Sequence, residues 1–234
     1  MRKNTIIYIL AAMLLGGCIE DTMPTDSLTQ DVVDASDNTV VAMLRGLPAC
    51  FHVDGSSTYG HHAFGYGAIM HIRDVQTHDL FVTESDYDQF LAWERNVNLG
   101  SNSGFMQYVW NYHYQSIHAC NNLIRKVADI DKATGVERGA LAAAYAFRAL
   151  FYLDLARCYE FLPCDLFPSG TNSEGHNVAH LTVPIVDENT TEEQSHSLPR
   201  ATREQMFRFI LADLDKAEEY IEYLDQSAEF GKKF

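Results

Sequence analysis

The chain has 234 residues, a formal net charge of −15 at pH 7 and an apolar content of 47%. That apolar content is sufficient for a packed core, and the length fits one domain or part of a larger protein. The excess of negative charge repels phosphate backbones, and no basic patch interrupts it along the sequence. The composition therefore argues against a nucleic-acid-binding protein.

Residues 1–17 have the layout of a secretory signal peptide. Arg2 and Lys3 form a short basic region, and an apolar run from Ile6 to Leu15 follows, too short and too early for a transmembrane helix. The run ends in Leu15-Gly16-Gly17-Cys18, which resembles the lipobox of bacterial lipoproteins. We predict cleavage after residue 17 and lipidation of Cys18. An ordinary signal peptide followed by a chance cysteine would have the same outline.

Residues 18–36 are polar and acidic and show no apolar periodicity. This composition predicts a flexible acidic tether between the lipid anchor and the folded part of the chain. Glu20 and Asp21, close behind the cysteine, resemble the surface-export signal of Bacteroidota lipoproteins. The N-terminal segments thus predict a protein that is lipid-anchored in the outer membrane and exposed at the cell surface.

Residues 37–234 have the pattern of an all-α domain. Asp37 is placed to cap a first helix, whose apolar spacing continues to Pro48. Residues 54–104 are rich in Gly, Ser, Asp, Asn and His, and we expect a long, mostly irregular insertion with a helical turn or two near Asp86–Trp93. A loop of this length is usually functional or disordered, and its aromatic residues argue against disorder.

Three longer helices are predicted after the insertion. Apolar residues recur at steps of three and four from Phe105 to Ile130, and again from about Glu137 until Pro163 ends the pattern. Thr202 and Gln205 have the spacing of a capping box, so a third helix should begin at Arg203. The apolar face predicted for this third helix consists of Met206, Ile210, Leu214, Ala217, Ile221 and Leu224.

The middle helix, ALAAAYAFRALFYLDLARCY from Ala140 onward, is apolar enough to suggest a membrane span. However, Arg148, Asp154 and Arg157 interrupt it, and each central charge in a membrane costs about 2.5–3.5 kcal/mol. Alanines also let neighbouring helices approach closely. We therefore predict a central packing helix in which the Arg148 guanidinium is buried against carbonyls or a carboxylate of a neighbouring helix.

The same helix resembles the signature helix of SusD/RagB-type outer-membrane nutrient-binding lipoproteins, R-A-x-x-Y-x-x-L-x-x-x-Y-x-x-x-P. Two further segments are similar to that family in the same order, VWNYHYQSIHACNNLIRKV and the PRAT of Pro199–Thr202. The positions that match the signature helix are Arg148, Ala149, Tyr152, Leu155, Tyr159 and Pro163.

The resemblance implies tetratricopeptide-like helix pairs and capture of a glycan or another nutrient at the cell surface. It also implies delivery of that ligand to a SusC-like TonB-dependent transporter. Members of the family are considerably longer, so the domain at 37–234 is expected to be incomplete at its C-terminus. The alternative is a lipoprotein in which a tetratricopeptide-like surface binds a protein or peptide as an interaction scaffold.

Sugar binding requires flat aromatic faces for the apolar side of the ring, and amide or charged side chains for its hydroxyls. The insertion supplies this chemistry at the place where the family often builds part of its ligand face. Tyr87 and Trp93 could equally pin the insertion to the helices. The ligand-binding residues that we predict are Arg73, Asp74, Tyr87, Trp93 and Asn96.

No motif predicts an enzyme, a cofactor or a metal site. The ten histidines include no HExxH spacing, and the chain has no nucleophile elbow and no Gly-rich phosphate loop. Closely spaced carboxylates such as Glu84 and Asp86 are typical of solvated acidic loops. The cysteines that remain after lipidation fit no zinc pattern, and we expect buried free thiols at Cys50, Cys120, Cys158 and Cys164.

Overall fold

The structure is a computed structural model in which every described residue belongs to the unit 38–234, one of two into which the chain divides. Within the described part, the backbone is helical or irregular, and the only β pairing is two isolated bridges. The all-α prediction is confirmed. The signal peptide, the tether, Cys18 and Asp37 lie outside the described part. The described residues are 39–53, 55, 58, 60, 62–77, 79–83, 89–95, 99–100, 103–163, 165, 168–172 and 174–226.

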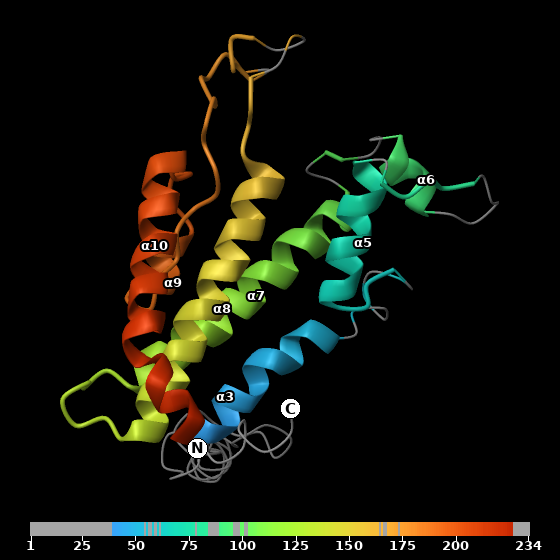
Figure 1. Cartoon of the computed structure of the whole chain (residues 1–234). Coiled ribbons are helices and arrows are strands. Elements are labelled where there is room, and N and C mark those ends of the chain that lie inside the picture. The colour runs from blue at the N-terminus through green and yellow to red at the C-terminus, as the bar shows by residue number, and fades with distance from the viewer. Residues whose placement is uncertain are drawn as a thin grey trace, which may run out of the picture. The chain divides into compact units, whose positions relative to one another are not determined.

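Three long helices, α7, α8 and α10, form the centre of the unit. Successive helices run in opposite directions, and α8 packs against both α7 and α10 (Figure 1). Helix α3 packs against α7 and α8, and the 3₁₀ helix η2 packs on α8. The helices are α3 (Thr39–Ala49), η1 (Cys50–His52), α5 (Tyr66–Gln76), α6 (Gln89–Glu94), α7 (Gly104–Lys126), α8 (Gly135–Tyr159), α9 (Glu192–Ser195), α10 (Arg203–Tyr220) and η2 (Ile221–Gln226).

Helix α8 is the central packing helix that the sequence predicts. It begins at a capping box, in which Thr134 accepts from the Glu137 backbone while the Glu137 side chain accepts from the Thr134 backbone. Among the described helices, it alone is long and apolar enough to cross a membrane, but 72% of that apolar stretch is buried inside the unit. Its last residue is Tyr159, four residues before Pro163.

The 3₁₀ helix η2 can approach α8 closely because a small residue lies near the start of α8. A Cβ at Gly139 would lie 2.7 Å from the carbonyl oxygen of Tyr223 and 2.9 Å from the Cα of Leu224, both on η2. No side chain fits at that distance from another backbone, so the contact between α8 and η2 requires glycine here.

Helix α10 begins at the predicted capping box of Thr202 and Gln205, but its predicted apolar face is partly wrong. Leu214 is 45% exposed and Ile221 is 56% exposed, whereas Asp213 is buried. The helix turns Asp213 inward because that carboxylate pairs with a buried arginine on α8. Apolar periodicity alone cannot detect such a buried ion pair.

The insertion at 54–104 contains more helix than predicted. Helix α6 lies where a short helix was expected, but α5 was missed because Gly65 and Gly67 resemble loop residues. Gly65 instead precedes the first turn with φ of 87°, and a Cβ there would lie 2.3 Å from the Phe51 carbonyl oxygen. The buried face of α5 has helical spacing and consists of Ala68, Ile69, Ile72 and Val75.

Candidate functional site

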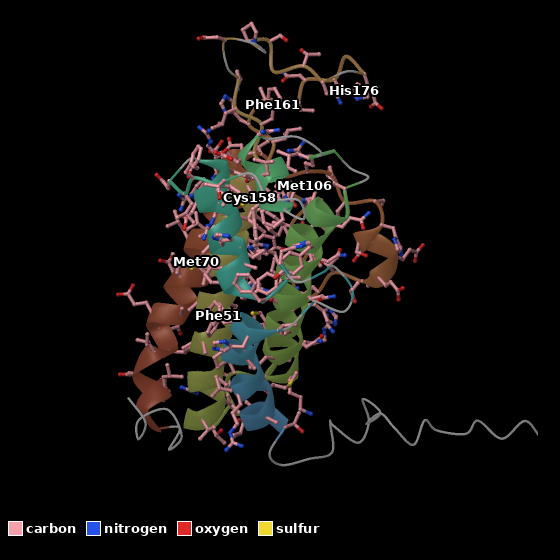
Figure 2. All side chains as sticks on the ribbon, turned by 90° about the vertical axis from the view of Figure 1, so that its right-hand side faces the viewer. Phe51, Met70, Met106, Cys158, Phe161 and His176 are labelled. Carbon is pink, nitrogen blue, oxygen red and sulfur yellow. The ribbon has the colours of Figure 1, made fainter. Side chains whose placement is uncertain are left out.

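Two of the predicted ligand-binding residues, Arg73 and Asp74, line one groove of about 500 Å³. The groove, which we call the Arg73 groove, lies between α5 with the residues that follow it, the start of α7 and the end of α8. Figure 2 shows this side of the unit, with Met70 on α5, Met106 on α7 and Cys158 on α8.

The lining of the Arg73 groove combines apolar and polar side chains. Its apolar part includes Ile69, Met70, Met106 and Val109. Its polar part contains two arginines, two aspartates, an amide and a hydroxyl, namely Arg73, Arg157, Asp74, Asp79, Gln76 and Thr77. The formal charges of the arginines and aspartates balance, so the polar lining offers hydrogen-bond donors and acceptors without a net charge.

Arg73 forms an ion pair with a buried carboxylate. Its Nη1 donates to Oδ1 of Asp154 on α8 at 2.7 Å, and the Tyr66 hydroxyl donates to Oδ2 of the same carboxylate at 2.7 Å. The Asp154 side chain is 4% exposed, whereas the Arg73 side chain is 27% exposed. The guanidinium carbon also lies 5.9 Å from the centre of the Tyr66 ring. The Arg73 guanidinium is thus paired with Asp154, and the residue still lines the groove.

The electrostatics of this cluster keep Asp154 ionised. Burial by itself raises the pKa of Asp154, but His113, the Tyr66 hydroxyl and the charge of Arg73 outweigh it and hold the pKa below its ordinary value. Burial and then the Asp154 carboxylate raise the pKa of Tyr66, so its hydroxyl stays protonated and can donate.

His113 on α7 completes the buried side of the cluster. Its side chain is fully buried, and its Nδ1 lies 2.7 Å from the Val109 carbonyl oxygen, so Nδ1 carries a hydrogen that it donates. Its Nε2 has no hydrogen-bond partner in the described part of the chain and lies 3.9 Å from Oδ2 of Asp154. That separation is longer than an ordinary hydrogen bond, so the effect of His113 on the pKa of Asp154 comes from a long polar contact.

Trp93 does not line the Arg73 groove. Its side chain is 2% exposed and meets the Phe90 ring edge-to-face at 4.8 Å and the His62 ring at 5.1 Å. A buried indole has no free face for a sugar ring, so this placement fits the packing alternative rather than the predicted stacking role. Tyr87 and Asn96 lie outside the described residues.

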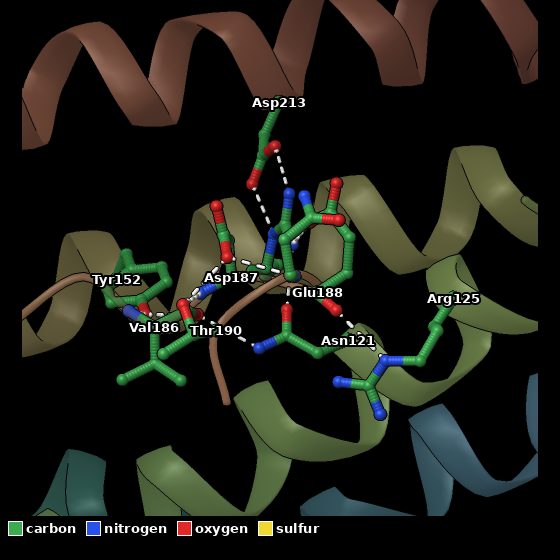
Figure 3. A network of polar contacts seen from close by, with 10 residues as sticks. Asn121, Arg125, Tyr152, Val186, Asp187, Glu188, Thr190 and Asp213 are labelled. Carbon is green, nitrogen blue, oxygen red and sulfur yellow. Dashed lines mark hydrogen bonds and ion pairs between the residues drawn. The ribbon is translucent and has the colours of Figure 1, made fainter. Parts of the chain in front are cut away.

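Arg148 forms a second buried polar cluster, whose other members Asp213, Asn121 and Glu188 are labelled in Figure 3. Its Nε and Nη2 donate to the two carboxylate oxygens of Asp213 on α10, each at 2.7 Å. Its Nη1 donates to Asn121 on α7 at 2.7 Å and to Glu188 at 2.6 Å. The predicted burial of Arg148 against a carboxylate of a neighbouring helix is confirmed, and the residue joins α7, α8 and α10.

The segment before α9 is tied to the same helices. The Tyr152 hydroxyl donates to the Val186 carbonyl at 2.8 Å and accepts from the Val186 N–H at 2.7 Å. Asn121 donates to the same carbonyl, and the Tyr114 hydroxyl donates to the Pro184 carbonyl at 2.7 Å. Another groove, of about 490 Å³, borders this segment, and Asn121 and Glu188 in its lining already serve the Arg148 cluster.

Arg200, in the segment before α10, closes the end of α8. Its guanidinium donates to the carbonyl oxygens of Tyr159, Leu181 and Thr182 at 2.6–2.8 Å. The Tyr159 carbonyl belongs to the last turn of α8, which lacks intrahelical donors. The PRAT segment therefore ends one helix through Arg200 and begins the next through Thr202.

Sequence reasoning did not connect Asp154 or His113, the two residues that lie behind Arg73, with the binding site. Asp154 was recognised only as an interruption of an apolar helix. The argument that predicted a buried partner for Arg148 applies to Asp154 as well, because a carboxylate in such a helix also needs one. That signal would have indicated a cationic partner, although not which one.

Metal binding and disulfides can be assessed for the described residues only. Within them, no group of three or more His, Cys, Asp or Glu side chains is placed to hold a metal ion. Cys50, Cys120 and Cys158 are free thiols, but the predicted burial holds only for Cys120: Cys50 is half-buried and Cys158 is exposed. Cys164 lies outside the described residues.

The fold has a counterpart among solved structures. The chain is similar to a SusD-like carbohydrate binding protein from Bacteroides vulgatus, with a TM-score of 0.56 and 20% identity. The similarity covers 77% of this chain and 35% of that chain, so this chain spans about a third of the length of the solved protein. At this identity the likeness establishes the fold alone. No curated protein matches the chain.

The sequence itself identifies the family. The pattern of the SusD-like family, described as "Starch-binding associating with outer membrane", matches residues 68–228. The match includes the α5 residues of the Arg73 groove, the Arg148 cluster and the whole of α7, α8 and α10. Because it covers well over half of the sequence and agrees with the fold, the chain belongs to the SusD-like family.

Proposed function

We propose that the protein is a cell-surface lipoprotein that binds an oligosaccharide and delivers it to a SusC-like TonB-dependent transporter. The observation that carries the proposal is the Arg73 groove, which lies within the part of the chain that matches a family described as starch-binding. The solved relative, of similar fold, is a carbohydrate binding protein. No catalytic role is proposed.

The lining of the groove suits a neutral sugar chain. A pyranose ring has apolar C–H faces and a rim of hydroxyls, each of which both donates and accepts hydrogen bonds. Ile69 and Met106 offer apolar surface, Arg73 and Arg157 offer donors, and Asp74 offers an acceptor. The balanced charges of the lining and the net charge of −15 both disfavour an acidic polysaccharide.

Binding can be tested on the purified full chain by isothermal titration calorimetry with maltoheptaose, cellohexaose, xylohexaose and mannohexaose. Arg73→Ala should weaken the tightest of these interactions at least tenfold, which corresponds to about 1.4 kcal/mol. Arg208→Ala is the matched control, because Arg208 is an exposed arginine on α10 outside the groove. Absence of binding to all four sugars, or equal affinity of wild type and Arg73→Ala, would contradict the proposal.

Tyr87 and Asn96 remain part of the proposed ligand face because of their position in the sequence. The matching substitutions are Tyr87→Ala and Asn96→Ala, each compared with wild type in the same calorimetric titration. A loss of affinity without a change in the far-UV helical signal would support a place in the ligand face. An unchanged affinity in both variants would remove this segment from the site.

The proposed anchor is a lipid on Cys18, which would hold the protein at the outer membrane. A labelled fatty acid fed to cells should enter the wild-type protein and not the Cys18→Ser variant. Equal labelling of the two would refute the anchor while leaving the binding proposal intact. Association with the transporter predicts that a TonB-dependent barrel co-purifies with the wild-type protein from detergent-solubilised membranes.

A specific observation favours the alternative function, a scaffold that binds another protein. Phe207, Leu211 and Leu214 form an exposed apolar row at helical spacing on α10, and they are 39%, 58% and 45% exposed. Such a row is typical of a protein-contacting helix face. Leu211→Glu should abolish a protein interaction of this kind without altering oligosaccharide affinity, which separates the two functions.

A further inference from the structure

The Arg73–Asp154 pair is more exposed than the Arg148–Asp213 pair. The Arg148 side chain is 2% exposed, and two of its nitrogens pair with both oxygens of Asp213 while a third donates to Asn121 and Glu188. The Arg73 side chain is 27% exposed, and it donates to Asp154 through Nη1. A guanidinium has five N–H donors. The Arg148–Asp213 pair is therefore closed inside the protein, whereas Arg73 lines a groove.

We propose that Asp154 is a positioning residue of the Arg73 groove, which holds the Arg73 guanidinium so that its remaining donors meet the oligosaccharide. This inference rests on the proposed function. Asp154 itself touches no ligand, since it lies on α8 with 4% of its side chain exposed and is not part of the groove lining. It acts through Arg73.

The carboxylate is itself held in one orientation. Oδ1 accepts from Arg73 and Oδ2 accepts from the Tyr66 hydroxyl, so the two oxygens have separate partners on the same helix, α5. Asp154 belongs to the most buried helix of the unit, between Leu153 and the fully buried Leu155. A rigid acceptor behind a flexible side chain limits the directions in which that side chain can point.

The energetic reason for such a device is the flexibility of arginine. Its long side chain loses rotamer entropy when it becomes fixed, and binding of an oligosaccharide would otherwise have to offset that loss. The ion pair with Asp154 orders Arg73 in the free protein, so the sugar meets a prearranged donor. Loss of Asp154 should therefore lower affinity even though no direct contact with the sugar is removed.

A merely structural role for Asp154 predicts a different result. If Asp154 served only to fasten α5 to α8, its hydrogen bond from Tyr66 would still do so without Arg73, and loss of Asp154 would lower affinity whether or not Arg73 was present. If Asp154 acts through Arg73, its loss should matter only when Arg73 is present. A double-mutant cycle in binding distinguishes the two roles.

The test measures the affinity of the full chain for the tightest-binding of the four named oligosaccharides in wild type, Arg73→Ala, Asp154→Asn and the double variant. Asp154→Asn should weaken binding about tenfold in the wild-type background and less than twofold in the Arg73→Ala background. Tyr66→Phe, which removes one hydrogen bond that orients the carboxylate, should weaken binding about threefold, again only with Arg73 present. Asp129→Asn is the matched control, since Asp129 is an exposed aspartate that pairs with Lys132.

Equal weakening by Asp154→Asn in both backgrounds would overturn the positioning role. An Asp154→Asn variant that binds as tightly as wild type, when Arg73→Ala binds more weakly, would also overturn it. If Arg73→Ala itself has no effect, the proposed function of the groove fails and the inference falls with it. Thermal unfolding monitored by circular dichroism checks that each variant is folded. Should Asp154→Asn fail to fold, Tyr66→Phe in the two backgrounds carries the same test.

Discussion

Replacement of Arg148 by methionine should be among the most damaging single changes in this unit. The substitution keeps an unbranched apolar stem in place of the arginine methylenes and removes the guanidinium. That group makes the bidentate contact with Asp213 and the hydrogen bonds to Asn121 and Glu188 (Figure 3). It also lies 4.9 Å from the centre of the Phe209 ring and 5.3 Å from that of Tyr145.

The expected loss of stability follows from the carboxylates that remain after the substitution. The Asp213 side chain is 3% exposed, so its carboxylate would be left buried without its cationic partner, whereas Glu188 at 20% can turn toward water. Removing one partner of a buried ion pair costs about 3–5 kcal/mol. For a chain of this size, that loss corresponds to a fall in melting temperature of roughly 6–20 °C.

Urea unfolding followed by circular dichroism measures the loss directly. Arg208→Met is the control, because Arg208 forms an exposed pair with Glu204 one turn away on α10, and its loss should cost less than about 0.5 kcal/mol. Adding Asp213→Leu to Arg148→Met should recover part of the stability, since the unpaired carboxylate is then gone. An Arg148→Met protein within about 0.5 kcal/mol of wild type would refute the reasoning.

Other predictions concern stability. Because the pKa of Asp154 is lowered from its ordinary 3.8, the stability that its ionised form contributes is present above about pH 4 and is lost as the pH falls through the lowered pKa. The difference in unfolding free energy between wild type and Asp154→Asn should therefore stay constant at neutral pH and shrink in acid, and a difference that does not become smaller between pH 5 and pH 2 would contradict this. Thr134→Ala removes the capping box of α8 and should cost about 1 kcal/mol in urea unfolding, whereas no change would mean that the cap contributes nothing. Gly139→Ala should destabilise the protein by more than about 1 kcal/mol, because its Cβ meets the Tyr223 backbone at 2.7 Å. Gly46→Ala, at a helical position with nothing within 4 Å, should instead stabilise it by up to about 1 kcal/mol, and the same sign for both changes would show that close approach is not the cause.

The sequence by itself determined the helices whose signals are local. The start of α10 follows from the spacing of Thr202 and Gln205, three residues apart on one turn. The packing role of α8 follows from charges placed among alanines and aromatics. These signals suffice because capping and helical periodicity depend only on neighbours within a turn or two. Helix α5 was not predicted because the sequence alone does not distinguish Gly65, which permits the approach of α5 to η1, from a loop glycine.

The tertiary structure alone decided which side chains meet. Arg73 and Tyr66 reach Asp154 from 81 and 88 residues away, and Arg148 reaches Asp213 across 65 residues. No local pattern encodes such pairs, because each exists only where the fold brings side chains of α5 or α10 to α8. The same packing buried Trp93, whose sequence neighbourhood fits a stacking platform as well as an anchor. Sequence patterns identify residues that need a partner, and the crossing of helices far apart in the chain selects which partner each one finds.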